Sequence, residues 1–106
     1  MNTKVKKTEN YTLMDIEGRL DTVTAAAFEA SVLEVLEKEA RLLILRCSDL
    51  EYISSSGLRV FLLAQKKMMA AGGKLQLCCL RPNIFEVFEI SGFTGIFQIL
   101  PDDAGL

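Results

Sequence analysis

The spacing of hydrophobic residues along the first half of the chain predicts two strands followed by a helix. Residues 11–17 (YTLMDIE) form a short run rich in large aliphatic side chains, and Gly18 follows, which predicts a strand that ends in a turn. A first short strand over residues 3–8 is expected to pair with it. From residue 24 to residue 40 the apolar positions recur at helical spacing while most charged residues fall between them, which predicts an amphipathic helix.

The second half of the chain continues this alternation. Residues 41–47 (RLLILRC) form a continuous apolar run, typical of a strand that is covered on both faces. A helix is expected to follow and to end at Gly72-Gly73, and residues 74–80 alternate like a strand. Pro82 begins a third helix, because proline suits the first helical position. Residues 96–100 form either a last short strand or an apolar tail on the core.

This order of elements predicts the fold class. Strands that alternate with helices give a small α/β domain with right-handed crossovers. We expect a mixed, partly parallel sheet of about four strands, flanked by about three to four helices. With 106 residues, 50% of them hydrophobic, the chain is expected to form a single domain over residues 1–106 with a core of its own.

Charge and composition argue against several classes of partner. The chain has 12 Lys and Arg against 14 Asp and Glu, a formal net charge of −2, so no binding to nucleic acid and no direct binding to a membrane is expected. No apolar run approaches the roughly 20 residues that span a bilayer, and a cytoplasmic location is expected.

Cysteine and histidine usage narrows the possible chemistry. The three cysteines are odd in number, and Cys78 and Cys79 are expected on opposite faces of a strand, which argues against a disulfide framework. Histidine is absent, which removes histidine-based catalytic triads and the commonest zinc ligand. Histidine-based catalysis and a histidine-ligated metal site are therefore not expected.

Three serines separate the expected strand 41–47 from the following helix, in the segment DLEYISSSGLRV, residues 49–60. We call Ser54, Ser55 and Ser56 the serine cluster. Such positions often carry function in α/β folds, because backbone N–H groups and the helix dipole gather there. A purely structural interpretation remains open, in which one serine caps the helix and the others fill a tight turn that Gly57 relaxes.

Three chemical interpretations of the serine cluster are not equally supported. A serine hydrolase would have to use Lys66 or Lys67 as its base, more than two helical turns away. A phosphate-binding loop would need more glycines and a lysine directly after the last one. Phosphorylation of a serine fits better: it adds about −1.5 to −2 charges, which a helix N-terminus tolerates and which a docking partner meets directly.

Three segments together resemble the STAS domain of bacterial anti-sigma-factor antagonists, over nearly the whole chain. Residues 18–25 (GRLDTVTA) are similar to a Gly-x-Leu-Asp signature that enters the first helix. Residues 49–62 (DLEYISSSGLRVFL) are similar to the segment Asp-Leu-x-x-hydrophobic-hydrophobic-Asp-Ser-Ser/Thr-Gly-Leu. Residues 72–97 resemble the Gly-Gly-x-Leu strand, the Pro-led helix and the Ser/Thr-Gly-hydrophobic close. The resemblance implies a small sheet flanked by helices.

The resemblance also implies a non-enzymatic protein–protein switch, with no catalytic residue, no metal site and no cofactor of its own. In that family the unphosphorylated antagonist binds an anti-sigma factor that is itself a serine kinase, and the sigma factor is released. Phosphorylation of the antagonist ends the binding, and a serine phosphatase of the PP2C type resets it. An alternative keeps the fold without the switch, as a fixed STAS subunit of a lipid-transport or signalling-scaffold complex.

The motif assigns roles to particular residues. Ser55 stands at the phosphorylated position, and the implied partner-binding residues are Asp21, Ser54, Ser55, Ser56, Gly57, Leu58 and Arg59. For Asp21 the alternative is a helix N-cap and nothing more. Ser54 replaces the aspartate of the motif, which leaves open whether phosphorylation is slower or falls on a neighbouring serine.

Overall fold

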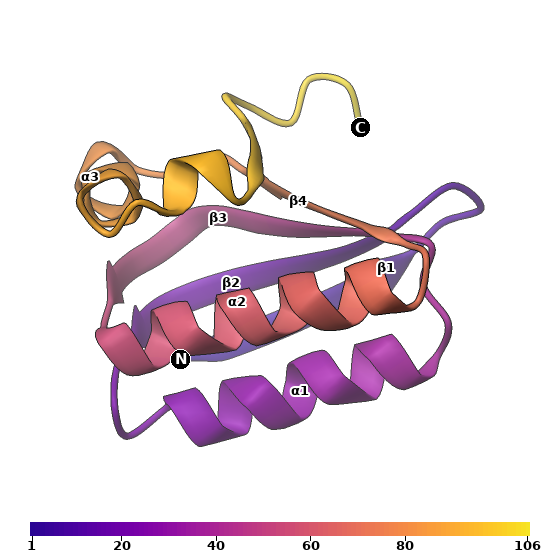
Figure 1. Ribbon diagram of the computed structural model, residues 1–106, viewed down its shortest axis with the longest axis horizontal. Helices are drawn as coiled ribbons and strands as arrows, with labels where there is room; N and C mark the ends of the chain where they lie inside the picture. The colour runs from indigo at the N-terminus through magenta and orange to yellow at the C-terminus, as the bar shows by residue number, and fades with distance from the viewer.

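A computed structural model describes residues 1–106 as one five-stranded sheet with two helices packed across one of its faces (Figure 1). The strands lie in the order β1-β2-β3-β4-β5, with β1 antiparallel to β2 and all other pairs parallel. The elements are β1 (Asn2–Lys7), β2 (Thr12–Leu20), α1 (Ala25–Glu37), β3 (Leu42–Ile53), α2 (Ser55–Ala70), β4 (Lys74–Cys78), α3 (Pro82–Ile90), the 3-10 helix η1 (Phe93–Gly95) and β5 (Gln98–Leu100). The predicted fold class is confirmed, with one strand more than expected.

The main core joins the sheet to all three helices. Phe61 of α2 lies at its centre, with its ring centroid 5.5 Å from those of Phe28 in α1 and Phe88 in α3. Phe97, just before β5, closes the cluster at 6.5 Å from Phe61. These aromatic contacts hold α3 and the C-terminal segment to the same core as α1 and α2.

The end of α2 and the start of α3 lie where the sequence predicted them, because a glycine and a proline mark these boundaries. Helix α2 ends before Gly72, whose φ of +78° is a conformation that glycine adopts without steric cost. Helix α3 begins at Pro82 as predicted. Residues 98–100 pair with β4, so the C-terminal run is a strand rather than an unpaired tail.

Two strands are longer than predicted, because β-bulges let them continue. β2 does not stop at Gly18 but runs to Leu20, and Gly18 adopts a φ of +96° at a shift in register against β3. β3 covers residues 42–53 rather than 41–47. Beyond residue 47 its buried residues recur every third position, at Cys47, Leu50 and Ile53, where a regular strand would bury every second one.

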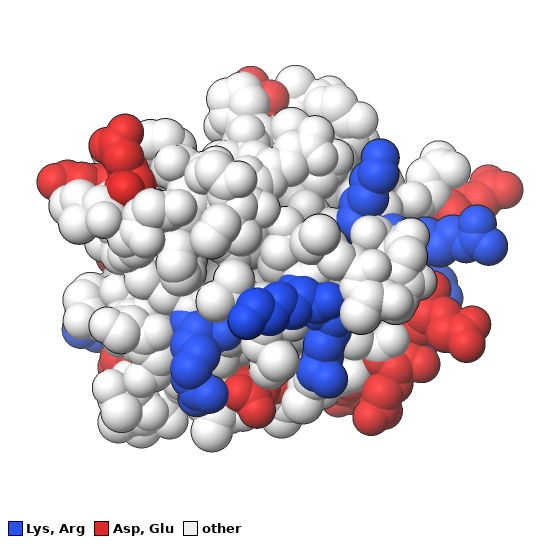
Figure 2. Space-filling view, viewed as in Figure 1, with Lys and Arg blue, Asp and Glu red and all other residues white.

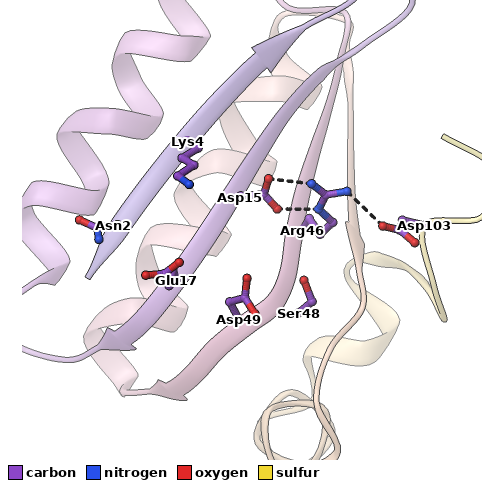
Figure 3. A pocket seen from close by; sticks show the side chains of 8 residues that line it. All are labelled: Asn2, Lys4, Asp15, Glu17, Arg46, Ser48, Asp49 and Asp103. Atoms are coloured by element: carbon purple, nitrogen blue, oxygen red, sulfur yellow. Dashed lines mark hydrogen bonds and ion pairs between the residues drawn. The ribbon is translucent and has the colours of Figure 1, made fainter.

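The face of the sheet away from α1 and α2 carries a polar pocket (Figure 3). Arg46 on β3 donates to both carboxylate oxygens of Asp15 on β2, and its Nη1 lies 3.0 Å from Oδ2 of Asp103. The hydrogen bonds with Asp15 raise the pKa of Arg46 far above its usual value. Arg46 thereby ties the C-terminal segment to this face.

The same face also carries a small apolar cluster, made of Leu13, Ile44 and Cys78. Cys79 packs against it, so the prediction that Cys78 and Cys79 lie on opposite faces is wrong. The reason is the backbone: β4 ends at Cys78, and Cys79 adopts a φ of +64°, which breaks the alternation of a strand. All three cysteines are free.

None of the helices has the length and hydropathy that crossing a bilayer requires. No group of three or more His, Cys, Asp or Glu side chains is arranged to hold a metal ion.

Candidate functional site

The candidate site forms where β2 and β3 end side by side. Leu20 and Ile53 are register partners, and the backbone N–H of Ser54 donates to the carbonyl of Leu20 at 2.8 Å. Asp21 and Ser54 are the next residues of the two strands, so the pairing brings them together at one edge. Two sequence motifs that are more than thirty residues apart therefore meet in one site.

The serine cluster forms the cap and first turn of α2, and the capping by one serine that the sequence left open is performed by Ser54. Ser54 is the N-cap residue, and its Oγ accepts a hydrogen bond from the backbone N–H of Gly57 at 3.2 Å. Its carbonyl accepts the first helical hydrogen bond, from Leu58 at 2.9 Å. Ser54 thus performs the capping that an aspartate can also perform, which accounts structurally for a serine at the motif's aspartate position.

Ser55 is the exposed member of the serine cluster, whereas Ser54 and Ser56 are half-buried. Ser55 is the first residue of α2, where backbone N–H groups have no acceptor within the helix. These groups and the positive end of the helix dipole favour an anion at this position.

Gly57 and Leu58 support the site from inside, since both are buried. A Cβ atom on Gly57 would lie 2.6 Å from Cγ of Leu20, so only glycine lets α2 begin this close to the end of β2. Arg59, in the next turn, is exposed. The outward-facing residues of this segment are therefore Ser55 and Arg59.

Asp21 organises the turn that precedes α1. Its Oδ1 accepts hydrogen bonds from the backbone N–H groups of Val23 at 3.0 Å and Thr24 at 3.1 Å, and from Oγ1 of Thr24 at 3.2 Å. The bond from the Thr24 N–H is the main reason that the pKa of Asp21 lies below its usual value of 3.8. Thr24, not Asp21, is the residue before the first turn of α1, so Asp21 stabilises the connection rather than the helix itself.

The structure adds two residues that the sequence did not indicate. Arg19 and Tyr52 are register partners on β2 and β3, and the Arg19 guanidinium carbon lies 4.2 Å from the centre of the Tyr52 ring. Nε of Arg19 is also 4.0 Å from Oδ2 of Asp21. The signal that would have revealed them is the register itself: aligning the two motifs as parallel neighbours places these residues opposite each other.

Exposed apolar side chains flank the site. Val23 is 88% exposed and Tyr52 is 41% exposed. Helix α3 is tied to the adjoining part of β3 by the side chain of Asn83, which donates to the carbonyl of Glu51 at 3.2 Å. Figure 2 shows acidic side chains over α3, and charged side chains scattered among uncharged ones at the end of the molecule where α2 begins. A polar centre with apolar surroundings suits contact with another protein better than chemistry on a small substrate.

Comparison with known proteins assigns the class. The model of the STAS domain matches residues 2–104, and the chain belongs to this family. A protein of Bordetella bronchiseptica that is named as an anti-sigma factor antagonist, BtrV, is 37% identical over 93% of this chain and 85% of its own length. The anti-sigma-B factor antagonist of Bacillus subtilis is 30% identical over 99% of this chain and 95% of its own.

These relatives place the chain among the anti-sigma factor antagonists, which are non-enzymatic regulators. Among solved structures, the Bacillus cell fate determinant SpoIIAA in its phosphorylated form superposes with a TM-score of 0.72. The alignment covers 94% of this chain and 92% of SpoIIAA at 20% identity, and it shows a shared fold. The resemblance indicated by the motifs is thereby confirmed at the level of the family.

Proposed function

We propose that this protein binds an anti-sigma factor with serine kinase activity, so that a sigma factor is released, and that phosphorylation of Ser55 ends the binding. The observation that carries the proposal is the position of Ser55. It is exposed in the first turn of α2, at an edge where Asp21 and Ser54 are held together by the pairing of β2 with β3.

A phosphate on Ser55 would be tolerated by the domain that carries it. The free N–H groups of the first turn and the helix dipole stabilise an anion there. Arg59 follows Ser55 by four residues and therefore lies on the same side of α2, where its guanidinium can pair with a phosphate. The fold would persist, and only a docked partner would encounter the new charge.

The hydrogen bonds of the serine cluster favour Ser55 over its neighbours as the modified residue. Oγ of Ser54 is used by the Gly57 N–H, and phosphorylation there would remove the cap of α2. Ser56 is half-buried. The cap of α2 is retained although the aspartate of the motif is missing, which supports the proposal that phosphorylation remains on Ser55.

The proposed partner surface combines exposed and half-buried residues around Ser55. Asp21, Ser56 and Arg59 supply polar contacts, and Val23 and Tyr52 supply exposed apolar area. Ser54, Gly57 and Leu58 hold the segment in place rather than presenting side chains to a partner. The proposal places the protein in the cytoplasm, assigns the ATP to the kinase partner, and includes a PP2C-type phosphatase that restores free Ser55.

The proposal is tested by affinity capture from a lysate of the source organism with four baits: the wild type, Ser55→Ala, Ser55→Asp and the control Ser91→Asp. Ser91 is an exposed serine after α3, so its aspartate adds the same charge elsewhere. We expect an ATP-binding serine kinase on the wild-type, Ser55→Ala and Ser91→Asp baits and its loss with Ser55→Asp. The captured kinase with ATP should then phosphorylate the wild type on Ser55 and leave Ser55→Ala unmodified.

Two results would contradict the proposal. If all four baits retain the same membrane or scaffold proteins, the chain is a fixed STAS subunit without a phosphate switch. If mass spectrometry finds the phosphate on Ser54 or Ser56 with Ser55 unmodified, the switch exists but the assignment of the residue is wrong.

A further inference from the structure

Two neighbouring thiols lie at the carboxyl end of β4, away from the serine cluster. Cys78 is the last residue of β4 and pairs with Arg46 on β3 and Leu100 on β5. It is fully buried in the small apolar cluster with Leu13 and Ile44, whereas Cys79 is half-buried. The pair therefore has one member that a small reagent can reach and one that is protected.

The backbone brings the two side chains to the same side of the chain. In an extended strand, consecutive side chains point to opposite faces. Cys79 instead has a φ of +64°, which is uncommon for a residue other than glycine, and it packs against the cluster that contains Cys78. Burial is the main reason that the pKa of Cys78 is raised to about 12, and the neighbouring thiol of Cys79 adds to this shift.

The third cysteine is separated from this pair. Cys47 is fully buried in the main core, with Met14 and Leu45, between the sheet and the helices, and it does not belong to the cluster of Cys78. The pair thus consists of two residues that are adjacent in sequence, one half-buried and one fully buried.

We propose that Cys78 and Cys79 form an oxidant-sensitive modification site, at which a hydroperoxide converts the two thiols into a disulfide between adjacent residues. This proposal is independent of the function proposed for Ser55.

The reaction is balanced by the two thiols and one hydroperoxide. The thiol of Cys79 loses its proton to water, and the thiolate attacks the terminal oxygen of the hydroperoxide, so that an S–O bond forms and the O–O bond breaks. The alkoxide that leaves (hydroxide, from hydrogen peroxide) takes up that proton from water and becomes an alcohol (or water). The sulfur of Cys78 then attacks the sulfenic acid of Cys79. The S–S bond forms, the S–O bond breaks, and the hydroxyl leaves as water with the proton of Cys78. Two thiols are oxidised by two electrons in total, and the peroxide is reduced.

Such a disulfide would be reversible rather than structural. The Cα atoms of adjacent residues in a trans peptide are about 3.8 Å apart, below the range of about 4.4–6.8 Å found for ordinary disulfides. A disulfide under this constraint is strained and is more easily reduced, as regulatory disulfides are.

The test treats the full chain with hydrogen peroxide, unfolds it in the presence of N-ethylmaleimide, and digests it with trypsin. Trypsin separates the cysteines, because Cys47 begins a peptide after Arg46, whereas Cys78 and Cys79 share a peptide that begins at Leu75. We expect the peptide that begins at Leu75 to carry no maleimide label after peroxide treatment. Its mass should be two hydrogen atoms below that of the same peptide with two free, unlabelled thiols. Dithiothreitol before labelling should restore both labels, and the Cys47 peptide should stay labelled throughout.

Two variants separate the proposal from unspecific oxidation. Cys79→Ala, a change at a half-buried position, should fold by circular dichroism and keep a labelled Cys78 after peroxide treatment. Cys47→Ala should form the disulfide as the wild type does. The proposal would be overturned by sulfinic or sulfonic acid on Cys79 with Cys78 still labelled, by a cross-link to the Cys47 peptide, or by a disulfide between two chains.

Discussion

Replacement of Gly57 by alanine tests how tightly α2 is fitted against the sheet. A Cβ atom at this position would lie 2.6 Å from Cγ and 2.9 Å from Cδ2 of Leu20, and 3.0 Å from Cγ1 of Ile53. An ordinary contact between carbon atoms is about 3.5–4.0 Å. Leu20 is fully buried and cannot move aside without a shift of α2 or of the end of β2.

The expected loss follows from two opposing contributions. Overpacking of this kind costs about 1–3 kcal/mol, and a clash with a branching carbon belongs in the upper half of that range. Alanine in place of glycine in a helix contributes about 0.5–1 kcal/mol in the other direction. We therefore expect Gly57→Ala to lower the free energy of unfolding by about 1–2.5 kcal/mol.

Urea unfolding followed by far-UV circular dichroism measures this difference. The matched control is Gly95→Ala, because a Cβ atom on Gly95 meets no atom within 4 Å, and its free energy of unfolding should stay within about 0.5 kcal/mol of the wild type. A second check is the double variant Leu20→Ala/Gly57→Ala, in which the clashing atoms of Leu20 are absent. Its loss in free energy of unfolding should be smaller than the sum of the losses of the two single variants. A Gly57→Ala protein as stable as the wild type would refute the reasoning.

Two further predictions concern the polar groups of the same edge. Ser54→Ala should lower the free energy of unfolding by about 1 kcal/mol, because the Gly57 N–H loses its acceptor. Ser54→Asp should not lower it, since aspartate also accepts from this N–H. Equal urea midpoints for the wild type and Ser54→Ala would contradict the assigned cap. Because the folded pKa of Asp21 is lowered, its carboxylate stabilises the fold fully above the unfolded pKa of about 3.9 and ceases to do so as the pH falls through the folded pKa. The difference in free energy of unfolding between the wild type and Asp21→Asn should therefore be constant from about pH 7 to pH 5 and shrink toward about pH 2. An unchanged difference at about pH 2 would contradict the role assigned to the Asp21 carboxylate.

The sequence predicted features that local chemistry specifies. Pro82 and Gly72 mark the helix ends by themselves, because one residue fixes φ and the other permits a positive φ. The order of strands and helices follows from the spacing of apolar residues. Asp21 and Ser55 could likewise be singled out, because each stands at a fixed position within a short contiguous motif.

Features that depend on pairing between distant segments were not predictable in this way. The extension of β3 to Ile53 requires bulges against β2, and these are visible only in the register of the two strands. The contact between Arg19 and Tyr52 has the same origin. Which serine caps α2 and which is exposed depends on the residue at which α2 begins. Sequence patterns do not define a helix start to within one or two residues.

The bond from the Ser54 N–H to the Leu20 carbonyl has a consequence for how a signal would be transmitted. It joins the start of α2 to the end of β2, so a phosphate on Ser55 would place its charge directly at the surface proposed for the partner. The coupling free energy between phosphorylation and binding would then arise wholly at the contact surface, from charge and desolvation, and not from a population shift within the domain. Such coupling is electrostatic, and the discrimination between the two forms should weaken as ionic strength rises.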